Sequence, residues 1–168
     1  MKVHSATLAA FAASLTMVAA CNSTPDVGAV DAATAPKPTT LAGPVELLQP
    51  EQGDVRSVVK TAALAAAARQ HRLVVYVGAT WCEPCERFRE AAKAGTLDAT
   101  FPGLSLLVFD IDRDRARLAA AGYKSQYIPL LVLPNADGSA GPHRMEGGQK
   151  GNGAVAQMAP RLAELLKN

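Results

Sequence analysis

The chain has 168 residues, of which 49% are hydrophobic and 19% charged, a composition typical of a globular protein. Its 17 basic and 15 acidic residues give a formal net charge of +2. This balance, without a basic stripe interleaved with aromatic residues, argues against a nucleic-acid-binding protein. The length favours one domain with attached segments.

Residues 1–20 are typical of a secretory signal peptide. Lys2 precedes an apolar stretch, 7–20, that ends in small residues and falls short of the roughly 20 residues that a membrane-spanning helix needs. Residues 18–21, Val-Ala-Ala-Cys, resemble the lipobox of bacterial lipoproteins, in which the signal is cut before a cysteine that then carries lipid. The resemblance implies that Cys21 is the lipidated N-terminus of the mature chain, and Asn22 favours the outer membrane over the inner. Ordinary cleavage that releases a soluble protein is the alternative.

Residues 21–45 are expected to comprise the lipidated cysteine and a flexible linker. The segment is rich in Pro, Ser, Thr, Ala and Gly and has no apolar period. About 23 flexible residues have a root-mean-square reach of roughly 25–30 Å, enough to hold a domain just off a membrane surface. The domain is assigned to residues 46–168. Packing of residues 41–48 against this domain is the alternative to a fully flexible linker.

From residue 54 onward, helical and strand patterns alternate. Val55, Val59 and Ala66 recur at helical spacing after Asp54, a suitable N-cap. The predicted helices span 54–70, 82–94, 112–121 and 152–167, and the predicted strands span 73–77, 104–109, 130–133 and 141–145. Pro160 is expected to kink or interrupt the last helix. Apolar strands alternating with helices predict an α/β fold, a central sheet with helices on both faces.

Cys82 and Cys85 lie where a predicted buried strand turns into a helix. Cysteines at i and i+3 of a first helical turn are close enough for a disulfide. The unpaired N–H groups and the dipole of a helix N-terminus favour a thiolate. We expect Cys82 to be the more exposed sulfur and the nucleophile, and Cys85 to resolve the mixed disulfide. Trp81, Glu83 and Pro84 are expected to support the site. Pro84 does so because proline suits a first helical turn.

The region from about residue 55 to the C-terminus resembles thioredoxin. Residues 81–85, Trp-Cys-Glu-Pro-Cys, are similar to the family's active-site motif, and residues 127–133 are similar to its cis-proline strand. The resemblance implies a thioredoxin fold with a mixed sheet and a cis Ile128–Pro129 bond. It implies that Ile128 and Pro129 bind an extended substrate segment by strand addition. Gly147 or Gly148 matches the glycine before the family's last helix, and no organic cofactor is implied.

Three positions depart from the family's pattern. Tyr76 stands where thioredoxins carry a buried aspartate, and Val108 stands in place of a buried lysine, so the usual proton relay is absent. Glu83 replaces a glycine. An anion beside Cys82 raises the pKa of its thiol and should make the dithiol more reducing. Our hypothesis is that Glu83 counteracts the helix dipole and takes part in proton transfer.

A metal site finds little support in the sequence. Zinc would need about four ligands, and beyond the cysteine pair only Cys21, His71 and His143 are candidates, so no metal is predicted. His71 and His143 are expected in solvated turns. The acidic and basic run 110–115 is expected to mark a helix N-terminus and a solvated face rather than a cation site.

The sequence thus predicts a thiol-disulfide oxidoreductase that is lipid-anchored in a bacterial cell envelope and faces the periplasm. It would be a monomer that reduces disulfides of exported proteins and receives electrons from another thiol protein, a membrane-embedded transporter, with oxidation of such disulfides as the alternative direction. Membrane-anchored thioredoxins of cytochrome c maturation share the Trp-Cys-Glu-Pro-Cys motif, but they usually carry an insertion for which this chain has no room. A purely structural disulfide, or a binding module that uses the same scaffold without catalysis, would also be compatible with the motif.

Overall fold

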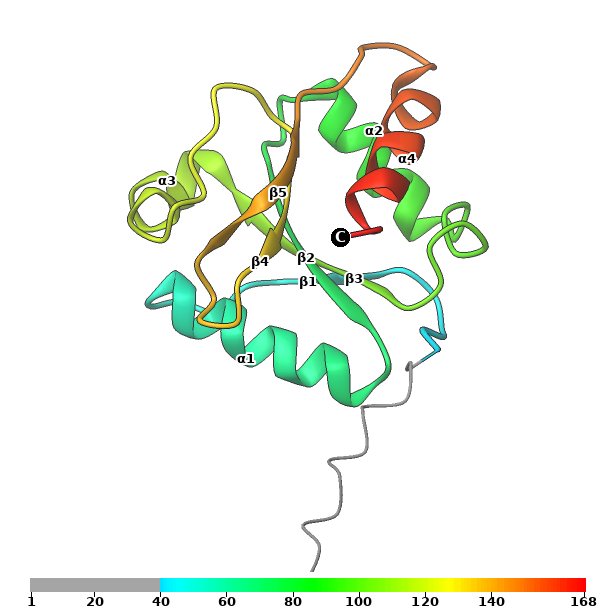
Figure 1. Cartoon of the computed structure of the whole chain (residues 1–168). Coiled ribbons are helices and arrows are strands. Elements are labelled where there is room, and N and C mark those ends of the chain that lie inside the picture. The colour runs from blue at the N-terminus through cyan, green and yellow to red at the C-terminus, as the bar shows by residue number, and fades with distance from the viewer. Residues whose placement is uncertain (1–39) are drawn as a thin grey trace, which may run out of the picture. The chain divides into compact units, whose positions relative to one another are not determined.

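The computed structural model describes residues 40–168 (Figure 1). The predicted signal peptide, Cys21 and most of the linker lie outside the described residues. The elements are, in chain order, β1 (Glu46–Leu48), α1 (Val55–Ala68), β2 (Arg72–Gly78), α2 (Glu83–Lys93), β3 (Leu104–Asp110), α3 (Ile111–Ala120), β4 (Leu130–Pro134), β5 (Ala140–Glu146) and α4 (Ala154–Leu165).

The five strands form one mixed sheet in the order β1-β3-β2-β4-β5. Strands β1, β3 and β2 are parallel, whereas β4 is antiparallel to β2 and β5 is antiparallel to β4. Helices α2 and α4 pack together on one face of the sheet and α1 contacts α3 on the other (Figure 1). The predicted α/β architecture, a thioredoxin fold with helices on both faces, is confirmed.

The eight predicted elements are all present, with ends that differ by a few residues. Asp54 caps α1, because its side chain accepts a hydrogen bond of 2.9 Å from the backbone N–H of Ser57. The expected interruption at Pro160 is wrong, since α4 continues through this residue. Pro160 and Ala156 are both exposed, so the carbonyl group that the proline leaves without a helical partner can bind water. Within residues 40–168, no helix combines the length and apolar character that crossing a membrane would require.

Strand β1 was not predicted. It pairs in parallel with β3, where Glu46 lies opposite Ser105 and Leu48 opposite Leu107. Three residues are too few to show a strand period, so only the tertiary pairing identifies this element.

This pairing also corrects the prediction for His71, which is buried at 8% exposure instead of lying in a solvated turn. The hydroxyl of Ser105 donates to Glu46 Oε2 at 3.1 Å and lies 3.0 Å from His71 Nδ1. His71 is therefore enclosed by a polar cluster that forms only when β1 docks on the sheet. His143 is exposed, but it lies on the edge strand β5 and not in a turn as predicted.

The run 110–115 does mark a helix N-terminus, because the Asp110 side chain accepts from the backbone N–H of Asp112 at 2.8 Å. The face of α3 that these residues form is only partly solvated. Asp114 is 6% exposed, accepts from the backbone N–H of Asp110 and forms an ion pair with Arg117.

Candidate active site

The two cysteines of the motif form a disulfide at the start of α2, with their Cα atoms 5.2 Å apart. Cys82 is the N-cap of the helix in an extended backbone conformation, and Pro84 lies in the first turn. Cys82 is 5% exposed and Cys85 is fully buried. The outer sulfur is therefore that of Cys82, while the core covers that of Cys85.

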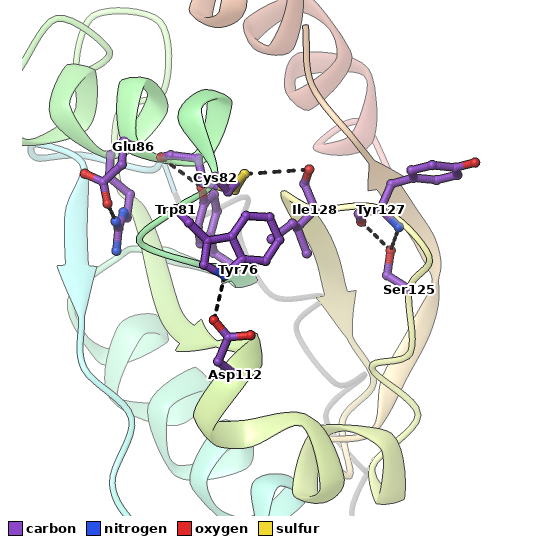
Figure 2. Close-up of a disulfide and its surroundings, with 10 residues drawn as sticks. Tyr76, Trp81, Cys82, Glu86, Asp112, Ser125, Tyr127 and Ile128 are labelled. Carbon is purple, nitrogen blue, oxygen red and sulfur yellow. Dashed lines mark hydrogen bonds and ion pairs between the residues drawn. A yellow bond between two sulfur atoms is a disulfide. The ribbon is translucent and has the colours of Figure 1, made fainter. Parts of the chain in front are cut away.

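The loop before β4 approaches the outer sulfur. The Ile128–Pro129 peptide bond is cis, as predicted. The carbonyl oxygen of Ile128 lies 3.9 Å from Sγ of Cys82 (Figure 2). A backbone acceptor thus faces the sulfur from an element that is distant in sequence.

A third segment completes the site. A Cβ atom at Gly148 would lie 3.0 Å from Cβ of Pro84 and 3.5 Å from Cδ of Pro129. Glycine lets the chain pass this close to Pro84 without a shift, while the contact with Pro129 would be of ordinary length. A groove of about 230 Å³ lies beside Cys82, and its lining consists of Trp81, Cys82, Glu83, Pro84, Ile128, Gly148 and Lys150.

Two exposed aromatic residues belong to the site region. Trp81 lines the groove, and Tyr127 precedes the groove residue Ile128 in sequence. Trp81 is 68% exposed, and its indole N–H donates a 2.7 Å hydrogen bond to Asp112 Oδ2 (Figure 2). Tyr127 is 66% exposed and its ring points away from the disulfide (Figure 2). Asp112 was not predicted as part of the site, because nothing local in the sequence indicates that the start of α3 lies under Trp81.

Glu83 is an anion whose charge is largely paired. Its Oε1 accepts hydrogen bonds from Arg87 Nε at 2.9 Å and from the backbone N–H of Gly151 at 3.2 Å. The hydrogen bond from Arg87 is the main effect that lowers the pKa of Glu83, with the Gly151 N–H and the charges of Arg87 and Lys150 acting in the same direction. Glu83 is therefore ionised at neutral pH and has no proton to give there. Its field at Cys82 is weaker than that of an unpaired carboxylate.

Tyr76 occupies the space below the disulfide. Its side chain is fully buried, it stacks on Phe88 with ring centroids 6.1 Å apart, and its hydroxyl donates to the carbonyl oxygen of Cys85 at 3.1 Å. Val108 lies directly opposite on β3. Burial raises the pKa of Tyr76 well above its usual range, so the phenol keeps its proton and cannot act as a base.

Comparison with solved structures finds thioredoxins of similar architecture. A mutant thioredoxin from Halobacterium salinarum NRC-1 is 22% identical, with a TM-score of 0.48 over 75% of this chain and 92% of that one. The thioredoxin of Trichomonas vaginalis is 16% identical, with a TM-score of 0.47 over 72% of this chain and 96% of that one. A scan against protein-family models finds no match, and neither does a search of curated proteins.

The strand order, the cis-proline loop and the disulfide at a helix N-terminus define the class of this protein on its own geometry. It is a thioredoxin-fold protein with a Cys-x-x-Cys disulfide whose outer sulfur borders a groove. Within residues 40–168, no three His, Cys, Asp or Glu side chains gather as metal ligands would.

Proposed function

We propose that the protein is a thiol-disulfide oxidoreductase that uses Cys82 as nucleophile and Cys85 as resolving cysteine. The observation that carries this proposal is the placement of Cys82. Its sulfur is the outer one of the pair, at the N-cap of α2, and lies 3.9 Å from the backbone of Ile128 beside a groove. A helix N-terminus favours the thiolate form, and the thiolate is the attacking species.

In the reducing direction, the Cys82 thiolate attacks one sulfur of a client disulfide. A bond forms between Cys82 and the client, and the other client sulfur leaves as a thiolate. Cys85 then loses its proton and attacks Sγ of Cys82, which releases the second client thiolate. The protein's dithiol ends as the Cys82–Cys85 disulfide, and the client gains two electrons. The backbone at Ile128 and Pro129 would hold the client segment as an added strand, beside Trp81.

The cellular setting that we propose rests on the sequence. A lipid on Cys21 would anchor the protein in a bacterial cell envelope, facing the periplasm and more often on the outer membrane. Disulfides of exported proteins would be the clients, and a membrane-embedded thiol transporter would donate electrons to the monomeric protein. Incorporation of labelled fatty acid that is lost in Cys21→Ser would support this setting, whereas an unlabelled native chain in the soluble fraction would contradict it.

The activity is tested by reduction of insulin with dithiothreitol as electron donor. The native chain should accelerate insulin precipitation, Cys82→Ser should abolish the acceleration, and Cys85→Ala should accumulate mixed disulfides through Cys82. A native chain no better than Cys82→Ser would overturn the proposal.

A binding module without turnover is the second candidate, and the exposed Trp81 at the groove favours it. In that case Cys82→Ser would keep its full affinity for a peptide captured by the native chain, and the native chain would show no insulin reduction.

A further inference from the structure

The resolving step needs a way to remove the proton of Cys85, whose side chain is fully buried. Tyr76 stays protonated and Val108 is apolar, so neither of the two strand residues below the disulfide can accept a proton. The proton must therefore leave by another route.

A polar pocket of about 380 Å³ shares a wall residue, Gly78, with the surroundings of Cys85. It lies at the ends of β2 and β3, and its polar lining includes Arg89, Asp110, Arg113, Asp114 and Arg117. Gly78 forms part of its wall. A volume of this size accommodates several water molecules, at about 30 Å³ each.

Gly78 places this pocket next to the buried sulfur. A Cβ atom at position 78 would lie 3.4 Å from Sγ of Cys85 and 2.9 Å from Cε1 of Tyr76. Gly78 therefore belongs to the pocket wall and also borders Cys85. A side chain at this position would press against the Tyr76 ring and against Cys85.

Arg89 brings a positive charge to the same place. It follows Cys85 by one helical turn, so the two side chains lie on the same face of α2. Its guanidinium forms an ion pair with Glu86, but its buried Nε has no hydrogen-bond partner among residues 40–168. The charge of Arg89 also opposes the effect of burial on the pKa of Tyr76.

The other charged groups around the pocket belong to α3 or to its N-cap and not to α2. Asp114 and Arg117 form an ion pair, Asp110 caps α3, and Arg113 is exposed. Arg89 is thus the cation whose position along α2 ties it to Cys85.

We propose that Arg89 is a positioning residue that stabilises the thiolate of Cys85 during resolution, and that water in the pocket behind Gly78 accepts the proton. This inference rests on the proposed oxidoreductase function. In the step, the S–H bond of Cys85 breaks and its proton passes to water. The thiolate then forms a bond with Sγ of Cys82 as the bond between Cys82 and the client sulfur breaks.

The test separates the two thiol steps with 5,5′-dithiobis(2-nitrobenzoate) as the probe. The reduced full chain, with Cys21→Ser so that only two thiols react, is mixed rapidly with one equivalent of the reagent. The first thionitrobenzoate is released by attack of Cys82, and the second by attack of Cys85 on the mixed disulfide. Both rates are measured from pH 5 to pH 10.

Arg89→Gln should slow the second release about tenfold at pH 7 and raise the midpoint of its pH profile by about one unit, because a nearby opposite charge shifts such a midpoint by roughly one to three units. The first release should stay within a few-fold of the native rate. Arg89→Lys should restore most of the second rate. Arg115→Gln, which removes an exposed charge of α3 outside the pocket lining, is the matched control and should leave both rates unchanged.

Two further variants decide which group accepts the proton. Tyr76→Phe should leave the midpoint of the second release in place, and a loss of the second phase in this variant would make the phenol the base and overturn the proposal. A midpoint that moves in Asp110→Asn but not in Arg89→Gln would assign the proton to a carboxylate and also overturn it. A native chain whose first release is no faster than that of a denatured thiol would instead contradict the proposed function itself.

Discussion

The hydroxyl of Tyr76 donates a hydrogen bond of 3.1 Å to the carbonyl oxygen of Cys85. Strand β2 and the first turn of α2 are thus joined directly below the disulfide by a neutral group. Where thioredoxins carry a buried acid, this chain uses a phenol that packs and bonds but does not ionise at neutral pH. The chemistry of the buried sulfur must therefore depend on groups other than this strand residue.

Tyr76→Phe should lower the free energy of unfolding by about 1 kcal/mol, the usual net contribution of one buried hydrogen bond. The ring and its stacking on Phe88 remain in this variant. The urea midpoint should fall with no change in the slope m. Tyr127→Phe, at a site 66% exposed, is the control and should shift the free energy by less than about 0.5 kcal/mol. Equal losses in the two variants would contradict the role of the Tyr76 hydroxyl.

Gly78→Ala should destabilise the chain by about 1–3 kcal/mol, because the added methyl group overpacks a filled interior. The new Cβ would lie 2.9 Å from the Tyr76 ring, so the ring or the backbone must move. Gly153→Ala is the control, since a Cβ there meets only the amide end of Gln149, at 3.4 Å. Thermal unfolding checks both variants, and a Gly78→Ala chain as stable as the native one would show that Tyr76 can shift freely.

Glu46→Gln should lower stability near pH 7 by less than about 1 kcal/mol, since its side chain is partly exposed and solvent screens the interaction. Burial, the largest single effect, favours the neutral acid. The hydrogen bonds from Arg69 and Ser105 and the charges of His71 and Arg69 together outweigh it and lower the pKa of Glu46 below its ordinary value of 4.5. The ionised form therefore stabilises the fold above pH 4.5, and this contribution is lost as the pH falls through the folded-state pKa.

The measurement for this prediction is urea unfolding of the native and Glu46→Gln chains between pH 3 and pH 8. The difference between them should be present at neutral pH and shrink below about pH 4.5. Glu164→Gln is the control, because Glu164 pairs with Lys167 at 70% exposure and should contribute nothing measurable. A difference that grows on acidification would contradict the assignment.

Glu83→Gln should raise the reduction potential of the disulfide, making the dithiol less reducing. Removing the anion stabilises the Cys82 thiolate and hence the reduced state of the protein. The reduction potential should rise by up to about 30 mV for each unit by which the pKa of Cys82 falls below the working pH. Arg87→Gln should act in the opposite direction, because it leaves the charge of Glu83 uncompensated. Equilibration with glutathione buffers measures both potentials, and shifts of the same sign in the two variants would sink this account.

The sequence by itself determined every described element except β1, and the position of the sulfurs along the chain. Apolar β-branched runs such as 73–77 and the helical spacing after Asp54 are local patterns, and each places an element regardless of what packs against it. The Trp-Cys-Glu-Pro-Cys segment is local too, whereas the cis bond before Pro129 was predicted from the resemblance to thioredoxin. The closeness of Cys82 to Ile128 was predicted from the resemblance to thioredoxin, because no local pattern connects residues 46 positions apart.

The tertiary structure alone decided which charges and polar groups meet. Strand β1 is too short to carry a period, and burial of His71 depends on Glu46 and Ser105 arriving from two other strands. The pairing of Glu83 with Gly151, and the approach of the pocket at Gly78 to Cys85, join segments through the packing of α2 on the sheet. Electrostatic and hydrogen-bond interactions act over a few ångströms in space, whatever the separation in sequence, so a linear pattern does not encode them.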